Sequence, residues 1–330
     1  MTTYMILGGN GVFGVQMTRY LLLNIPQAHV ICVGRNAEKP PAFSLHLGID
    51  DSRYEYHQIH VAYETERLLE LLDAKRPGII INIAAQGEGA ASWKYSWRFF
   101  ETNAVALAKM VEPLIGATWL RKWVQMGSSE VYGSVDAPAN EESPLRASSP
   151  YSASKAAADL YLLAIHRARN FPMNIIRPSN AYGPGQQLHR VIPRAILCAF
   201  SGRKLPLQGG GVARKSYIHT DDLSRAIYLI AERAPAGKVY NAGPKESVAI
   251  RTLVEKIAEK TGVPFQDLVE IVPDRMGQDA QYLLDSSRIA SELGWQPRTG
   301  LDEGIADVVE WVRTHLDFLK RQPQEFIFRA

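Results

Sequence analysis

Residues 4–14 read YMILGGNGVFG, in which an apolar run leads into a loop with glycines at 8, 11 and 14. This pattern at the junction of a strand and a helix is typical of a dinucleotide-binding turn. Gly8 permits a tight turn, Gly11 lets the backbone approach a pyrophosphate, and Gly14 lets the helix pack closely on the strand. Val12 and Phe13 open that helix, whose N-terminus attracts negative charge. The stretch predicts a Rossmann-type α/β fold.

The rest of the first half alternates short β-branched runs with longer amphipathic stretches, which predicts βαβ units and a doubly wound parallel sheet. The expected strands are 4–7, 30–33, 79–83, 123–126 and 174–177. The expected helices are 15–23, 64–75, 93–115 and 151–169. Beyond residue 177, prolines and a Gly-Gly-Gly loop at 209–211 interrupt the pattern, and a helix at 221–232 and a strand at 238–241 then resume it.

These changes predict two lobes that are interleaved in the chain. The dinucleotide-binding domain is expected at 1–177, with 218–245 returning to it. A smaller substrate lobe is expected at 178–217 and 246–330.

Composition excludes several classes of protein. The 37 basic and 34 acidic residues are scattered, so no nucleic-acid polymer is expected as a partner. No run approaches the ~18 apolar residues that a membrane span requires, and the first residues do not resemble a signal peptide. Two cysteines in apolar runs, Cys32 and Cys198, favour a reducing compartment, and we expect a cytoplasmic protein. The histidines lack metal-ligand spacing, so no metal site is predicted.

The residues after the second strand bear on the choice of cofactor. That strand is followed by Gly34-Arg35-Asn36, where an enzyme that prefers NAD usually has an acidic residue for the ribose hydroxyls. An arginine there can pair with a 2′-phosphate. Arg35 therefore favours NADP, with NAD as the alternative, unless it is only a solvated surface residue.

A candidate catalytic group follows the strand 123–126. Ser128 comes directly after that strand, and Tyr151 and Lys155 are four apart on an expected helix, so they share a face. The lysine would depress the pKa of the phenol and could bond the nicotinamide ribose, which would make Tyr151 a usable base. With Ser128 on the same substrate hydroxyl, the three predict hydride removal from a secondary alcohol.

The chain resembles the extended short-chain dehydrogenase/reductase family, and specifically its nucleotide-sugar epimerases, dehydratases and reductases. The resemblance covers nearly the whole length and rests on several motifs together. They are GGNGVFG at 8–14, NIAAQ at 82–86, ETNAVAL at 101–107, GSSEVYGS at 127–134, SPYSASKAAAD at 149–159, RPSNAYGPG at 177–185, RKSYIHTDDL at 214–223, DRMGQD at 274–279 and LGWQP at 293–297.

The resemblance implies roles for further residues. The glycine loop, Tyr151 and Lys155 would share the cofactor with five further residues, Asn36, Ala84, Ala85, Asn103 and Pro178. Ser129, Asn180, Arg214 and Arg275 would bind the substrate, with the two arginines pairing with its diphosphate.

Glu130 bears on the type of reaction. In sugar-nucleotide 4,6-dehydratases, a carboxylate two residues after the serine or threonine removes the C5 proton, although Glu130 could instead cap a loop or helix. Ser129 stands where the dTDP-glucose form, which reads TDE, has an aspartate, and this resembles the GDP-mannose form more closely.

The resulting hypothesis is an NAD(P)-dependent 4,6-dehydratase acting on a nucleotide-diphosphate sugar. A 4-keto-6-deoxy-sugar nucleotide reductase or a C4 epimerase on the same scaffold is the nearest alternative. A non-catalytic NAD(P)-binding protein is a further alternative, against which Ser128, Tyr151 and Lys155 together argue. The helices 93–115 and 151–169 have apolar positions on more than one face, which predicts a homodimer.

Overall fold

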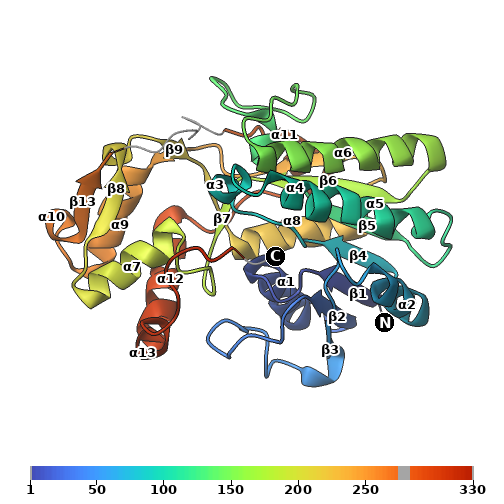
Figure 1. The fold of residues 1–330 in the computed structure, drawn as a ribbon, viewed down its shortest axis with the longest axis horizontal. Coiled ribbons are helices and arrows are strands. Elements are labelled where there is room, and N and C mark those ends of the chain that lie inside the picture. The colour runs from blue at the N-terminus through green and yellow to red at the C-terminus, as the bar shows by residue number, and fades with distance from the viewer. Residues whose placement is uncertain (1, 274–282, 329–330) are drawn as a thin grey trace.

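A computed structural model describes residues 2–273 and 283–328. Within these ranges, parallel strands form one seven-stranded sheet in the order β11-β6-β5-β4-β1-β2-β3 (Figure 1). Their bounds are β1 Thr2–Leu7, β2 Ala28–Gly34, β3 Tyr54–Gln58, β4 Ile79–Asn82, β5 Lys122–Met126, β6 Met173–Pro178 and β11 Val239–Ala242. The strand order reverses between β1 and β4, which is the point where open sheets of this class bind ligands.

Helices cover both faces of the sheet, so successive strand residues enter opposite cores. Tyr4 and Ile6 of β1 pack toward α1 (Val12–Asn24), α8 (Thr220–Arg233) and α11 (Ser287–Leu293). Met5 and Leu7 pack toward α2 (Thr65–Lys75), α5 (Ala106–Val111) and α6 (Pro150–Arg169). Burial on both faces explains why the inner strands read as continuous apolar runs. The predicted doubly wound α/β fold is confirmed.

The smaller lobe has its own core, built from short strand pairs and helices. The strand pairs are β7 (Asn180–Tyr182) with β10 (Tyr217–His219), β8 (Leu205–Gln208) with β13 (Val269–Val272), and β9 (Arg214–Lys215) with β12 (Val248–Ala249). The helices are α7 Val191–Ser201, α9 Ile250–Thr261, α10 Phe265–Leu268, α12 Leu301–Thr314 and α13 Leu316–Leu319.

The two lobes exchange more segments than the sequence suggested. Ile289 and Trp295, which the expected boundaries place in the smaller lobe, pack in the core around α1 and α8. In the other direction, Phe43 of the loop after β2 packs in the small-lobe core. The boundary at 246–330 is therefore too simple.

The stretch predicted as one helix at 93–115 is divided. It consists of α4 (Ser96–Phe100), a π-helical turn η2 (Glu101–Val105), α5 and a 3₁₀ turn η3 (Glu112–Leu114), and the separate short helix α3 (Gly89–Ser92) precedes it. Further 3₁₀ turns are η1 Asp51–Arg53, η4 Ser129–Tyr132 and η5 Gly209–Gly211. Strand β3 was not predicted at all.

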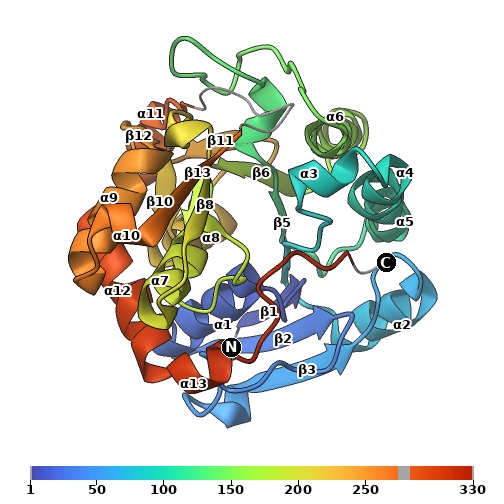
Figure 2. The ribbon, with the colours of Figure 1, turned by 60° about the vertical axis from the view of Figure 1, so that its left-hand side comes forward.

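The tail after α13 crosses from the small lobe to the large one, and Figure 2 shows it running in front of the strand ends toward α4 and α5. Glu325 forms an ion pair with Arg194 of α7 at 2.7 Å. Phe328 stacks on Tyr95 beside α4, with ring centroids 4.2 Å apart. The tail is therefore attached on both sides of the space between the lobes.

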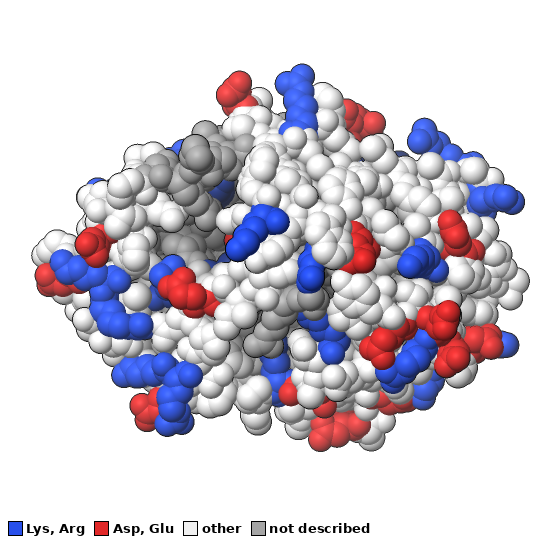
Figure 3. Space-filling view, in the orientation of Figure 1, with Lys and Arg blue, Asp and Glu red and all other residues white. Residues whose placement is uncertain are grey.

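On the face in Figure 3, basic and acidic side chains lie scattered among one another rather than gathered in a stripe. Among the described helices, none combines the length and apolar character needed to span a membrane.

Candidate active site

A cavity of about 960 Å³ lies between the lobes. Its lining comes from the glycine loop, the carboxyl ends of β2, β4, β5 and β6, the start of α6, and the small lobe from Asn180 onward. The cavity therefore lies at the carboxyl edge of the sheet, where the glycine loop and Ser128 follow their strands. The volume lies at the upper end of the range usual for small-molecule sites.

The glycine loop has the geometry of a dinucleotide cradle. Gly8 has φ +87°, and a Cβ there would lie 2.7 Å from the backbone nitrogen of Ala84. A Cβ on Gly14 would lie 2.4 Å from the carbonyl oxygen of Gly8, so only glycine allows α1 to approach β1 this closely. Gly11 is the N-cap of α1 and makes no side-chain cap, which leaves the first backbone N–H groups available to a phosphate.

Most of the predicted cofactor residues line this cavity. They are Gly8, Gly11, Val12, Phe13, Arg35, Asn36, Ala84, Ala85, Tyr151, Lys155 and Pro178. Gly14 lies behind the loop, where it performs the packing role expected of it. Asn103 also lies outside the lining. Its amide bonds both backbone groups of Gln86, at 2.9 and 3.1 Å, and Ser154 Oγ at 2.9 Å, so it supports the loop after β4.

The four predicted catalytic residues all face the cavity. Ser128 and Glu130 lie at the turn that follows β5, where Ser128 Oγ accepts a hydrogen bond from the Glu130 backbone N–H at 3.2 Å. Tyr151 and Lys155 lie in the first turns of α6. That helix begins with a capping box between Ser149 and Ser152 and with Pro150 in its first turn.

The electrostatics of the tyrosine differ from expectation. Burial raises the pKa of Tyr151 because the phenolate loses its solvation, and the Glu130 carboxylate raises it further. The Ser128 hydrogen bond and the Arg190 charge oppose this rise in pKa. The predicted depression of this pKa by Lys155 is not among the main influences on the phenol. The Lys155 ammonium donates to the Met126 carbonyl. Burial lowers the pKa of Lys155 itself to about 8.

A buried ion pair fixes α6 behind these residues. Asp159, one turn beyond Lys155, accepts from Arg177 Nε of β6 at 2.8 Å, and Arg177 Nη1 donates to the Tyr132 hydroxyl at 2.7 Å. Burial raises the pKa of Asp159, and the guanidinium opposes that rise. The pair links the catalytic helix to the sheet, and sequence analysis did not single it out.

The predicted substrate residues are only partly brought together. Ser129 and Asn180 line the cavity. Arg214 is exposed, and its guanidinium donates to the Ser247 carbonyl at 2.6 Å and to Ser247 Oγ at 3.1 Å. The next residue, Lys215, lines the cavity. Neighbouring strand residues point to opposite faces, so the cationic side chain that β9 presents to the cavity is that of Lys215 rather than Arg214. Arg275 lies outside the described residues.

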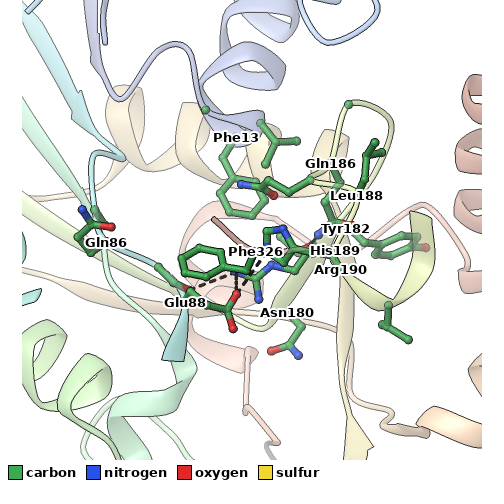
Figure 4. Close-up of a pocket in the computed structure, with 18 of the residues that line it drawn as sticks. Phe13, Gln86, Glu88, Asn180, Tyr182, Gln186, Leu188, His189, Arg190 and Phe326 are labelled. Carbon is green, nitrogen blue, oxygen red and sulfur yellow. Dashed lines mark hydrogen bonds and ion pairs between the residues drawn. The ribbon is translucent and has the colours of Figure 1, made fainter. Parts of the chain in front are cut away.

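The cavity also holds residues that the sequence analysis missed. Glu88, His189, Arg190 and Phe326 converge in it from three separate segments (Figure 4). Glu88 follows the motif NIAAQ at 82–86 by two residues, and no motif singled out His189, Arg190 or Phe326. Over the described residues, no group of three or more His, Cys, Asp or Glu side chains is placed to hold a metal ion.

Comparison with known proteins agrees with this geometry. The GDP-mannose 4,6-dehydratase family matches residues 5–308. The dTDP-glucose 4,6-dehydratase of Streptomyces griseus is 40% identical over 239 residues, which are 72% of each chain. That of Neisseria gonorrhoeae is 30% identical over 329 residues, covering 93% of this chain and 94% of the relative.

A solved structure extends the likeness to three dimensions. DesIV, the dTDP-glucose 4,6-dehydratase of Streptomyces venezuelae with NAD and TYD bound, has a TM-score of 0.89 and 29% identity. The match covers 96% of this chain and 98% of that one. The likeness spans both lobes and the cavity between them. The chain therefore belongs to the GDP-mannose 4,6-dehydratase family of NAD-dependent nucleotide-sugar enzymes.

Proposed function

We propose that this protein is a nucleotide-diphosphate-sugar 4,6-dehydratase. The observation that carries the proposal is that Ser128, Glu130, Tyr151 and Lys155 face one cavity, with Glu130 close enough to influence the phenol of Tyr151. A base for a hydroxyl proton and a separate base for a carbon proton therefore line the same space, which suits oxidation followed by elimination.

Each residue has a defined task in this reaction. Tyr151 takes the proton of the C4 hydroxyl. Ser128 orients the phenol of Tyr151 through the hydrogen bond between the two side chains. Lys155 lies one turn along α6 from Tyr151 and would hold the ribose of the cofactor. A nicotinamide bound there would supply the hydride acceptor for C4 and the hydride donor for C6. Because a C4 ketone acidifies the proton on C5, Glu130 can remove that proton, and water is lost across C5 and C6.

Mass spectrometry tests the proposal directly. The protein is incubated with dTDP-, UDP- and GDP-hexoses without added reduced cofactor, and loss of one water from a nucleotide sugar is expected. If no hexose loses water but a 4-keto-6-deoxy sugar nucleotide is reduced with NADPH, the protein is a reductase. Inversion at C4 without loss of mass would identify an epimerase.

NADP is the proposed preference over NAD. Arg35 and Lys39 both line the end of the cavity beyond β2, and Gly34 to Ala37 include no carboxylate. This charge suits a 2′-phosphate better than a free ribose hydroxyl. The structural relatives described as complexes hold NAD, so the preference is a specific claim about this chain.

A homodimer is proposed through α4, η2 and α6. Large apolar side chains stay exposed along these elements: Trp97 at 59%, Phe100 at 37%, Val105 at 49% and Leu160 at 54%. An apolar strip of this kind on two adjacent helices favours association with a second copy. Free, buried Cys32 and Cys198 suit the reducing environment of the cytoplasm, which is the proposed location.

A further inference from the structure

Three ionisable side chains meet in the cavity across the two lobes (Figure 4). Glu88 comes from the loop after β4, and His189 and Arg190 directly precede α7. Glu88 Oε2 lies 3.4 Å from His189 Nε2 and 3.2 Å from Arg190 Nη2. Arg190 also donates to the Gly87 carbonyl at 3.2 Å. The Glu88 side chain is only 15% exposed, and that of His189 18%. This is a built cluster rather than a surface ion pair.

The cluster borders the same space as the proposed base. A Cβ on Gly89, the residue after Glu88, would lie 3.7 Å from Glu130 Oε2. Phe326 of the C-terminal tail covers the other side, with its ring edge-on to His189 and the centroids 5.4 Å apart. The imidazole is therefore held between a carboxylate and an apolar ring, on a wall of the cavity that Glu130 shares.

The dehydratase reaction, on which this inference rests, needs one more group than the four residues assigned above. Hydroxide is a poor leaving group, so the C6 hydroxyl has to be protonated as it departs. Ser129, next to the base, carries a hydroxyl that is a weak acid. Arg190 does not give up its proton in proteins, and Glu88 is engaged with it in an ion pair at 3.2 Å. An imidazole can donate a proton near neutral pH.

We propose that His189, oriented by Glu88, is the general acid that protonates the departing C6 hydroxyl. Glu130 takes the C5 proton, and the electron pair of that C–H bond becomes the C5–C6 double bond. The C6–O bond breaks, and its oxygen leaves as water with the proton from His189. When hydride reaches C6, Glu130 returns its proton to C5. One proton then remains on Tyr151 and one is missing from His189, and exchange with solvent restores both.

A change of leaving group tests this role. In a nucleotide hexose with fluorine in place of the C6 hydroxyl, the departing group leaves as an anion and does not need the acid. His189→Gln is expected to slow dehydration of the hydroxyl substrate by about 10²- to 10⁴-fold, the usual effect of losing a general acid. Release of fluoride from the analogue should stay close to the wild-type rate.

Two variants serve as references. Glu130→Gln should lose both reactions, because both need a base at C5. His57→Gln, which changes a histidine outside the cavity on β3, should leave both at the wild-type rate. Glu88→Gln keeps His189 but removes the carboxylate that orients it. We therefore expect a smaller loss of dehydration of the hydroxyl substrate than in His189→Gln, again with fluoride release close to the wild-type rate. This variant also preserves the test if His189→Gln does not fold.

Three results would overturn the inference. Wild-type dehydration by His189→Gln would mean that Glu130 moves both protons. Equal loss of water elimination and fluoride elimination in a folded variant would mean that His189 only binds substrate or supports the cavity. If the wild-type protein removes water from no nucleotide hexose, the proposed function itself fails, and the role of His189 falls with it.

Discussion

Replacing Glu130 with glutamine should separate oxidation from elimination. The substitution keeps the size of the side chain and removes its charge. The Glu130 carboxylate raises the pKa of Tyr151, so its loss should lower that pKa and leave hydride transfer as fast as in the wild type or faster. Elimination loses its base and should slow by about 10²- to 10⁴-fold, which is roughly 2.7–5.4 kcal/mol in activation free energy.

Rapid mixing with substrate would follow the two steps separately. Reduced nicotinamide fluorescence should rise and persist in Glu130→Gln, while mass spectrometry finds little dehydrated product. Tyr151→Phe should abolish both signals, and Glu66→Gln, an exposed carboxylate on α2, should change neither. Circular dichroism would confirm that each variant is folded. Dehydrated sugar at the wild-type rate, or hydride transfer that slows together with elimination, would refute the assignment of Glu130.

Three further outcomes are expected. Arg35→Ala should weaken NADP binding by about 10- to 100-fold, which is the effect of losing a charge-assisted hydrogen bond, and should have little effect on NAD binding. If titration calorimetry finds the ratio of the two affinities unchanged, Arg35 does not discriminate between the cofactors. Sedimentation at micromolar concentration should show a dimer that Leu160→Glu shifts toward monomer, and a wild-type monomer would contradict the interface. Arg177→Met should lower the free energy of unfolding by about 3–5 kcal/mol, because it leaves the Asp159 carboxyl buried without its cation. Denaturant titration would measure this change, and adding Asp159→Leu should recover most of the loss.

The sequence predicted the elements that are buried on both sides. The apolar runs of β1 and β4 and the glycine loop between β1 and α1 have local signatures, and those elements were found within a few residues of their bounds. Strand β3 reads YEYHQ and lies at the edge of the sheet, half-buried and rich in polar side chains, so it lacks such a signature. The π-helical turn at Glu101–Val105 was missed because a helical pattern in sequence does not reveal a local change in hydrogen-bond register.

The site was predictable where one motif carries one role. Ser128, Tyr151 and Lys155 stand on a strand end and a helix start, and both are set by short-range sequence. The position of Arg214 depended on which of two neighbouring strand residues faces the cavity, and a two-residue strand gives too little pattern to decide it. Glu88 and His189 meet only because the two lobes close on each other.

The course of the tail affects how the protein should be handled. Its last described residue, Phe328, stacks on Tyr95 at the edge of the sheet where the cavity lies. Thr2 begins β1 and therefore lies at the opposite edge of the same sheet. An affinity tag on the C-terminal side would follow Phe328 and the residues 325–327 that line the cavity, whereas a tag before Thr2 would extend from the far edge of the sheet. Activity measured on a C-terminally tagged preparation should therefore be compared with activity after the tag has been removed.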